Sequence, residues 1–424
     1  MPKTTTLTTT PPKDFTKFGL DERLVTAVTE MGYERPTPIQ EQAIPLLMTG
    51  KDMIGSAQTG TGKTAAFGLP ILHKLLGEQI KQHYVRTLIL SPTRELAAQI
   101  EEALKAYAKH TKIKVAVVIG GVSIVPQTKR LKDGVDILVA TPGRLLDHVE
   151  HGNVKFDHLD VFVLDEADRM LDMGFLPDVR RIVAMLPNKR QTMLFSATVP
   201  PEIAVLAGSL LHNPERVQVG RTLQAAVGIT HAVYPVQAHL KPELLAALLR
   251  DIGSPSVLIF TRTKRRADKL ARALGKTGLK IAVIHGDRSQ NQRIAALEGF
   301  KRGKFEVLVA TDIAARGLDV EGITHVVNFD VPATPEDYVH RIGRTARAEA
   351  VGDAFTLVAP EEEFEMRQIE SHLGRVLPRV ALRDFDYGVA APETRSSLQR
   401  ASLNKKTIPT SFHSKRRKTL PRKK

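Results

Sequence analysis

The sequence predicts an α/β fold with two doubly wound domains, each a parallel sheet with helices packed on both faces. At 424 residues the chain is too long for one ordinary hydrophobic core, so two domains are expected. Each half of the chain repeats one pattern, in which a short aliphatic run is followed by a polar or glycine-containing cluster and then by a helical stretch. Aliphatic runs without alternation are typical of strands that are buried on both faces of a parallel sheet.

These runs predict about five strands in each domain. They lie at residues 53–54, 88–90, 137–140, 161–164 and 193–195 in the first half, and at 257–260, 281–284, 307–310, 325–328 and 354–358 in the second. In open α/β sheets, ligands bind at the carboxyl ends of the strands. The polar clusters that follow the runs are therefore expected to converge in space.

The predicted domain boundaries follow from where this pattern begins and ends. We expect a disordered N-terminus over residues 1–14, a first domain over 15–213, a linker over 214–227 and a second domain over 228–387. Residues 388–424 lose the periodic apolar positions and become basic and polar. We therefore expect a basic, disordered C-terminal tail.

The charge balance favours a polyanionic partner such as nucleic acid. The chain has 61 Lys and Arg residues against 46 Asp and Glu residues, a formal net charge of +15. Ten basic residues and no acidic one lie between Arg400 and Lys424, so the body of the protein is only mildly basic. Residues 414–418 are interpreted as part of an unspecific nucleic-acid-binding arm, with a nuclear address and a solubilising charge run as the alternatives.

Composition also excludes several classes of protein. The chain has no cysteine, which excludes disulfides and cysteine–zinc sites. No apolar run is long enough to span a bilayer, and the first twelve residues do not resemble a secretory signal. We therefore expect a cytoplasmic protein without a membrane partner.

A phosphate-binding loop is predicted at residues 57–64, between a strand and a helix. Its glycines allow backbone N–H groups to turn toward phosphate oxygens, and the following helix N-terminus adds partial positive charge. Lys63 is expected to reach the β- and γ-phosphates of ATP, and the Thr64 hydroxyl to bind Mg²⁺. The pattern normally begins with glycine, whereas this chain has Ala57. A flexible glycine loop is the alternative, and the order strand–loop–helix disfavours it.

The acidic cluster at residues 165–168 follows a buried strand. A carboxylate at such a strand end suits the second protein contact to Mg²⁺, which we assign to Asp165. Glu166 is then placed to orient or deprotonate the attacking water. Acidic residues also favour helix N-termini, so a solvated helix start is the alternative. The position after a buried strand favours the functional interpretation.

These motifs resemble those of the DEAD-box ATP-dependent RNA helicases. Residues 58–64, 165–168 and 196–198 are similar to motifs I, II and III of that family, and residues 32–40 resemble its Q motif. Further matches lie at 92–97, 120–121, 141–144, 310–319 and 340–344. The resemblance covers about residues 15–373 and is most like the bacterial RhlE-type branch. It implies two tandem RecA-like domains and an enzyme that couples ATP hydrolysis to local RNA duplex separation or RNA–protein remodelling.

The resemblance implies that both domains contribute to the ATP site. The implied cofactor-binding residues are Phe15, Tyr33, Arg35 and Gln40 around the adenine, Gln58, Thr59, Gly60, Thr61, Gly62, Lys63 and Thr64 around the phosphates, and Gly317 and Asp319 in the second domain. A glutamine amide can pair with the polar edge of adenine, and an aromatic ring can stack on its face.

Arg344 and Arg347 are implied to act as arginine fingers on the γ-phosphate. We expect Thr334 to cap the preceding helix and Gly343 to end it, so that both arginines lie on an exposed loop. The family has glycine where this chain has Ala346, which would be strained if that position requires positive φ. Arg344 is therefore the firmer assignment.

RNA contacts are also implied from both domains. They are Thr93, Arg94, Gly121, Thr141, Pro142, Gly143 and Arg144 in the first, and Thr263, Gly286, Thr311 and Asp312 in the second. Backbone amides, hydroxyls and arginines suit phosphate and sugar contacts, which read no base sequence. The residues expected to couple ATP hydrolysis to RNA binding are Asp168, Ser196, Thr198 and His340.

Three functions are compatible with these motifs. The first is an ATP-dependent RNA helicase, the second an ATP-gated RNA clamp or annealing chaperone, and the third a translocating DNA motor. The Q motif and residues 165–168 argue against the third. Stimulation of the ATPase by RNA but not by single-stranded DNA would discriminate, because only RNA offers the 2′-hydroxyl. Ribosomal or RNA-degradation machinery is a candidate protein partner.

Overall fold

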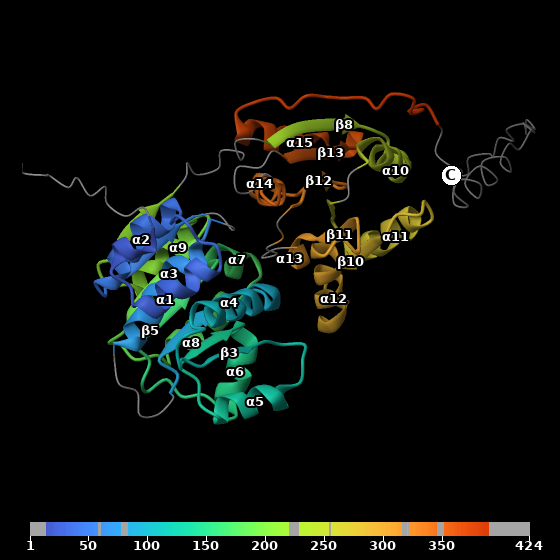
Figure 1. Cartoon of the computed structure of the whole chain (residues 1–424). Coiled ribbons are helices and arrows are strands. Elements are labelled where there is room, and N and C mark those ends of the chain that lie inside the picture. The colour runs from blue at the N-terminus through green and yellow to red at the C-terminus, as the bar shows by residue number, and fades with distance from the viewer. Residues whose placement is uncertain are drawn as a thin grey trace, which may run out of the picture.

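The computed structural model describes residues 14–57, 61–77, 84–219, 229–253, 256–315, 320, 322–345 and 352–389. These residues form two separate α/β domains, each with its own sheet (Figure 1). Every strand pairing within the two sheets is parallel, as predicted. The predicted fold class is therefore confirmed.

The first sheet has seven strands in the order β3-β4-β2-β5-β6-β1-β7. They are β1 (Met53–Ser56), β2 (Thr87–Leu90), β3 (Val115–Val118), β4 (Ile137–Ala140), β5 (Val161–Leu164), β6 (Gln191–Ser196) and β7 (Glu215–Gln218). Every residue of β2 to β6 is buried, because helices cover both faces of this sheet.

Two hydrophobic clusters fill the first domain, one on each face of the sheet. One joins the sheet to α1 (Glu22–Glu30), α2 (Pro38–Met48), α3 (Lys63–Leu76) and α4 (Arg94–Tyr107). The other joins it to α6 (Pro142–Glu150), α7 (Ala167–Asp172), α8 (Leu176–Val183) and α9 (Pro201–Leu210). A short 3₁₀ helix, η1 (Phe15–Phe18), precedes α1, and α5 (Ile124–Lys132) follows β3.

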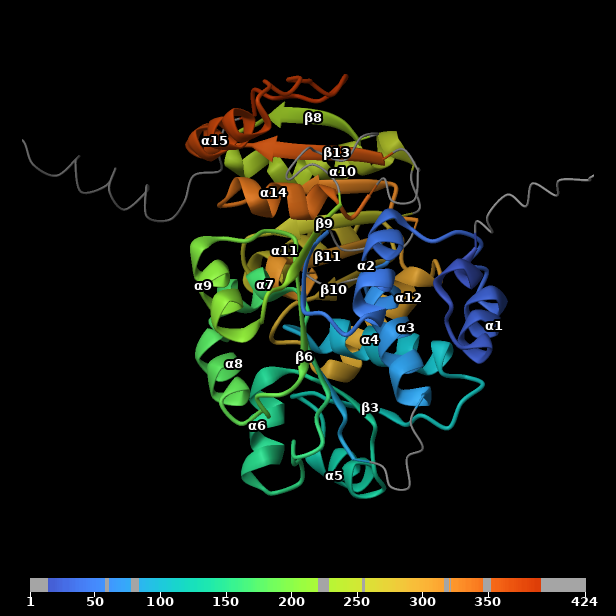
Figure 2. The same ribbon diagram turned by 90° about the vertical axis from the view of Figure 1, so that its left-hand side faces the viewer.

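The second sheet has six strands in the order β10-β11-β9-β12-β13-β8. They are β8 (Ile229–Pro235), β9 (Val257–Thr261), β10 (Ile281–Ile284), β11 (Val307–Thr311), β12 (His325–Asn328) and β13 (Gly352–Val358). One face is covered by α10 (Lys241–Ile252) and α11 (Lys264–Gly275). The other is covered by α12 (Gln290–Lys301), α13 (Asp312–Ala315), α14 (Pro335–Ile342) and α15 (Glu363–Leu373), as Figures 1 and 2 show. Two short 3₁₀ helices, η2 (Ala238–Leu240) and η3 (Pro360–Glu362), complete the described elements.

Three strands lie outside the predicted set. β7 falls within the segment that we predicted as a linker from residue 214, and it instead pairs with β1 and extends the first sheet. The prediction is wrong there because β7 is a short edge strand of mostly polar residues, in which only Val217 is buried. β8 is also an edge strand that mixes polar and apolar residues, which explains why the pattern does not predict it. The sequence of β3, Val-Ala-Val-Val, does fit the pattern, and its omission from the predicted strands has no structural reason. Residues 220–227 of the predicted linker lie outside the described residues.

None of the described helices is long and apolar enough to cross a membrane.

A buried His–Tyr pair joins β8 to α14, the helix that precedes Arg344. His231 Nδ1 and the Tyr338 hydroxyl are 2.9 Å apart, in the hydrophobic cluster between the sheet, α14 and α15. Burial, aided by the charge of Arg375, lowers the pKa of His231 to about 4. His231 is therefore neutral in the folded protein near neutral pH.

This pair predicts a loss of stability on mild acidification. Below about pH 6.5 the unfolded chain protonates its histidines, whereas folded His231 resists protonation until about pH 4. The contribution of neutral His231 to the free energy of unfolding is therefore complete above about pH 6.5 and is lost as the pH falls from there toward about 4. Chemical unfolding of the wild type and of His231→Gln, at several pH values between about 8 and about 5, measures this effect. We expect a weaker pH dependence in His231→Gln and an unchanged one in His372→Gln, whose histidine is exposed. Equal pH dependence in all three proteins would contradict the assignment.

Candidate functional site

The phosphate loop leads from β1 into α3. Gly62 precedes the helix with a left-handed backbone, at φ 89°. A Cβ atom there would overlap Gln40 Nε2 and lie 3.0 Å from Thr37 Oγ1. Both the backbone conformation and the space at residue 62 therefore require glycine. Gln58, Thr59 and Gly60 lie outside the described residues.

Two residues of the Q motif hold this loop. Thr37 Oγ1 donates a hydrogen bond to the Thr61 carbonyl at 2.7 Å, and Gln40 Nε2 donates to the Gly62 carbonyl at 3.1 Å. Gln40 Oε1 in turn accepts from the Thr37 N–H at 2.8 Å. Both ends of the Gln40 amide are thus occupied by the protein, and in this structure Gln40 positions the phosphate loop. Thr37 was not predicted as a site residue, although the capping-box spacing Thr37-x-x-Gln40 carries the signal.

The other residues expected around the adenine differ in exposure. Phe15 is fully buried in the core, and its ring centroid lies 6.1 Å from that of Tyr33. Tyr33 is half-buried and also packs edge-on against Tyr107, whereas Arg35 is exposed. Phe15 therefore lies in the core beneath Tyr33. Ala57, which stands in place of the usual glycine, is buried in the same core.

Lys63 and Asp165 form the buried centre of the site. Lys63 is only 6% exposed, and among the described residues its Nζ atom has no hydrogen-bond partner. Burial raises the pKa of Asp165 to about 6, the charge of Lys63 opposes this rise and that of Glu166 adds to it. Thr64 follows Lys63 on the first turn of α3 and is half-buried. A buried ammonium group without a partner is unfavourable, and a phosphate group placed here would satisfy it.

Glu166 is held by an arginine that we did not predict. Its carboxylate Oε2 accepts a hydrogen bond from Arg169 Nη1 at 2.7 Å, and the two side chains are only 4% and 3% exposed. Glu166 also has a left-handed backbone, at φ 53°. Such strain in a non-glycine residue often marks a functional site. The spacing of three residues on one helix was the available sequence signal for Arg169.

The residues predicted to couple the two activities are brought together. Asp168 Oδ2 accepts hydrogen bonds from the Thr198 N–H at 2.8 Å and from Thr198 Oγ1 at 3.0 Å. The Asp168 N–H donates to Ser196 Oγ at 3.1 Å. His340 of the second domain lines the same cavity, of about 610 Å³, as Asp168 and Thr198.

The arginines of the second domain differ in their surroundings. Arg341 makes two hydrogen bonds to Asp312, at 2.6 and 2.8 Å, and others to Asn328 and to the Asp330 carbonyl. The Asp312 carboxylate, predicted to contact RNA, therefore holds Arg341 in this structure.

The predicted exposed loop is wrong for Arg344, which is only 4% exposed. Thr334 caps α14 and Gly343 ends it, as predicted, but the Arg344 N–H then donates to the Arg341 carbonyl and continues the turn. Arg344 consequently lines a small cavity together with Arg169 and His340. Gly317, Asp319, Ala346 and Arg347 lie outside the described residues.

Two of the predicted RNA-binding residues of the first domain, Arg94 and Arg144, lie beside the double glycine at residues 120–121. The Arg94 guanidinium lies so close to Gly121, which has φ 76°, that a Cβ atom there would overlap it. Arg144 Nη1 donates to the Val122 carbonyl at 3.1 Å, and Thr93 caps α4. Thr141 and Pro142 begin α6, and Gly143 has open space around it. In the second domain, Thr263 caps α11, Gly286 faces open space and Thr311 ends β11.

The two domains contact each other beside these residues. Arg293 Nη2 lies 2.8 Å from Glu95 Oε2, in an ion pair whose side chains are 11% and 3% exposed. Gln290 Nε2 donates to the other oxygen of Glu95 at 2.8 Å. α12, which carries Gln290 and Arg293, lies close to α4 in both views (Figures 1 and 2). None of these three residues was predicted, because an ion pair between distant segments has no local sequence signal.

Comparison with known proteins identifies the family. The DEAD/DEAH box helicase model matches residues 37–206, and the helicase conserved C-terminal domain model matches residues 240–349. ATP-dependent RNA helicase CshA of Listeria monocytogenes is 48% identical over 359 residues, which cover 84% of this chain and 68% of that protein. DEAD-box ATP-dependent RNA helicase CshA of Bacillus subtilis is 46% identical over 397 residues, or 92% and 80% of the two chains. The more specific resemblance to an RhlE-type branch stays a prediction.

Solved structures agree in fold. S. cerevisiae Dbp5 bound to RNA and ADP BeF3 superposes with a TM-score of 0.78 at 30% identity, over 87% of this chain and 95% of Dbp5. Mss116p bound to ssRNA and AMP-PNP gives a TM-score of 0.79 at 29% identity, over 87% and 79%. The sheets described above are thus two RecA-like domains, and the chain belongs to the DEAD-box family of ATP-dependent RNA helicases.

Proposed function

We propose that this RNA-dependent ATPase and helicase works as a two-domain clamp, whose ATP site is complete only when both domains close on ATP and RNA. The main support for this proposal is a cavity that residues of both domains line. Arg169, which holds Glu166, comes from the first domain, and Arg344 comes from the second. Groups from both domains then surround one reacting phosphate. ATP binding consequently favours the closed arrangement, because it contacts both domains there.

In this proposal the first domain binds the phosphates of ATP. Lys63 gains a partner for its buried ammonium group, and the loop held by Thr37 and Gln40 supplies backbone N–H groups. The oxygen atoms of Asp165 and Thr64 suit Mg²⁺, which usually takes one or two protein ligands together with substrate phosphates. The described residues contain no group of three or more His, Asp or Glu that could hold a metal alone. When bound, Mg²⁺ neutralises charge on the phosphates.

Hydrolysis needs a water molecule aimed at the γ-phosphate and compensation of the charge that develops. Glu166 orients this water and accepts its proton, and Arg169 holds the buried carboxylate in position. Arg344 supplies positive charge to the transition state from the second domain. Asp168 accepts a hydrogen bond from the Thr198 N–H and donates its own N–H to Ser196, and this network links a change at the phosphate to His340.

In this proposal, RNA binds across a surface of the first domain that is formed by Thr93, Arg94, Gly121 and residues 141–144. Thr263, Gly286 and residues 311–312 extend it in the second. Closing around one strand holds it in a form that a duplex cannot adopt, and the complementary strand is released. The names of the relatives favour this helicase over an annealing chaperone. A cytoplasmic location and ribosomal or RNA-degradation partners stay predictions.

The space at Gly62 predicts how ATP binding can be lost. Gly62→Ala places a methyl group against Gln40 and strains the backbone, so the phosphate loop shifts. We expect the affinity for a fluorescent ATP analogue to fall at least about tenfold, which corresponds to about 1.4 kcal/mol. Gly208→Ala is the matched control, because that helical glycine has open space around it. Unchanged affinity in Gly62→Ala would contradict the assigned geometry.

If Glu166 is the general base, replacing it should slow ATP hydrolysis without weakening ATP binding. Glu166→Gln should bind ATP normally but lower RNA-stimulated turnover by about 10²–10⁴-fold, the usual contribution of a general base. Lys63→Ala should instead weaken ATP binding. Arg169→Ala should lower turnover more than Arg169→Lys, which keeps a cation beside Glu166. Steady-state ATPase assays measure all four variants, and near-normal turnover in Glu166→Gln would refute its role.

Arg344 is expected to act only in the chemical step. Arg344→Ala should keep ATP binding and lose about 10³–10⁵ in turnover, the range known for arginine fingers. Arg302→Ala, at an exposed position of the same domain, serves as the control. Turnover of Arg344→Ala equal to that of the control would exclude the finger.

A further inference from the structure

The two edge strands of the second sheet differ in whether another segment of the chain covers them. At one edge, β8 is bordered by residues 377–380. The Val233 N–H donates to the Pro378 carbonyl and the Val380 N–H to the Val233 carbonyl, both at 2.8 Å. At the other edge, β10 pairs with β11 and with no further strand among the described residues. An uncovered edge strand offers unpaired N–H and C=O groups to another chain.

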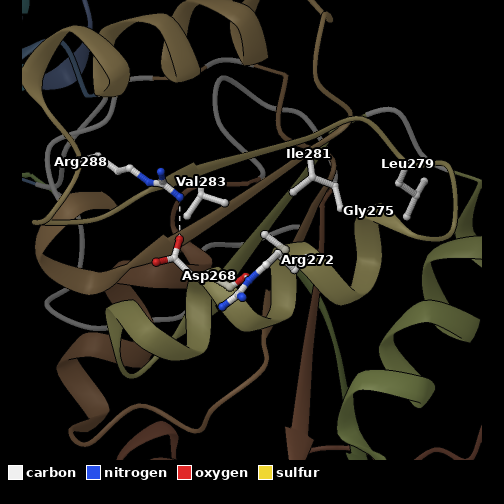
Figure 3. A pocket seen from close by; sticks show the side chains of 8 residues that line it. Asp268, Arg272, Gly275, Leu279, Ile281, Val283 and Arg288 are labelled. Carbon is white, nitrogen blue, oxygen red and sulfur yellow. Dashed lines mark hydrogen bonds and ion pairs between the residues drawn. The ribbon is translucent and has the colours of Figure 1, made fainter.

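A cavity of about 460 Å³ lies beside this free edge, between β10 and α11 (Figure 3). Its apolar lining comes from Ala271, Leu279, Ile281 and Val283, and Gly275 leaves it open at the end of α11. Ile281 and Val283 are half-buried, whereas Ala282 and Ile284 are buried on the opposite face of the sheet. We call this feature the β10–α11 groove.

A basic stripe runs along α11 and beyond it beside the groove. Arg265, Lys269, Arg272 and Lys276 are exposed and spaced by four, three and four residues, which places them on one side of the helix. Arg265, Lys269 and Lys276 form no ion pair with the rest of the described chain. The acidic residue of the groove, Asp268, is bound to Arg288 at 2.6 Å and to His285 at 3.0 Å. The groove thus combines apolar walls, a free strand edge and a positive rim.

We propose that the β10–α11 groove binds an extended acidic segment of a partner protein, which pairs with the edge of β10 and inserts an aliphatic or aromatic side chain into the cavity. In such strand addition the backbone hydrogen bonds give affinity and the pocket gives specificity. The basic stripe favours carboxylates over other side chains.

Two other occupants fit less well. The C-terminal segment of this chain, from Arg400 onward, contains ten basic residues and no acidic one, so the stripe repels it. Single-stranded RNA would match the stripe, but its phosphates and sugars would use neither the apolar lining of the groove nor the free edge of β10, whereas an extended peptide uses both.

The test is a selection from phage-displayed random peptides of about twelve residues on the full-length protein. Gly275→Leu fills the groove from a helical position where an added Cβ has open space and φ is not left-handed. Gly208→Leu is its matched control on α9. A second test variant reverses two charges of the stripe, Lys269→Glu together with Arg272→Glu. Its control, Lys301→Glu together with Lys304→Glu, changes the net charge equally on an exposed part of the same domain.

We expect the enriched peptides to carry net negative charge and apolar residues. Their affinity should fall at least about tenfold for Gly275→Leu and for the Lys269 and Arg272 reversal, and stay unchanged for both controls. RNA-stimulated ATP turnover should be unchanged in all four variants, which separates this surface from the catalytic site.

Three results would overturn the proposal. They are the absence of any enriched peptide, the enrichment of neutral or basic peptides, and equal binding to the groove variants and their controls. If the Lys269 and Arg272 reversal weakened the binding of a short RNA while no peptide depended on the groove, the surface would belong to RNA.

Discussion

The charges buried at the carboxyl end of β5 are the constraint on which the site depends. Glu166 has a buried partner in Arg169, but Asp165 has its pKa raised by burial, and Lys63 has no hydrogen-bond partner among the described residues. Such a centre is poorly compensated within one domain. ATP phosphates would give Lys63 its partner, so ligand binding relieves an unfavourable burial that the fold itself imposes.

The second domain adds a further cation beside this centre. Arg344 is directed into the cavity that also contains Arg169, while Arg341, only three residues earlier, is fully engaged with Asp312, Asn328 and Asp330. The approach is stabilised by polar contacts, above all the buried Glu95–Arg293 pair. Because breaking a buried ion pair leaves two poorly solvated charges, this contact favours a defined relative position of the domains over many loose ones.

The sequence was sufficient for the parts of the protein that obey local rules. Aliphatic runs located ten of the strands, and the family resemblance named most residues that meet at their ends. Predictions were weakest where tertiary contacts decide. A mostly polar edge strand such as β7 lacks the hydrophobic pattern, so its sequence predicts a linker. The extra turn after Gly343 has no sequence signature, so the sequence predicts an exposed loop for Arg344. Glu95 and Arg293 are 198 positions apart, and no periodicity connects them.

We expect ATP and RNA together to close the two domains around one site. Because the chain has no cysteine, one can be introduced in each domain at exposed positions, as Lys132→Cys and Lys301→Cys, and spin-labelled without background. Pulsed electron–electron distance measurements then report the separation of the domains. We predict one narrow distribution when a non-hydrolysable ATP analogue and single-stranded RNA are both present, and a broader, different one with either alone. The same distribution under all conditions would contradict closure driven by ATP and RNA.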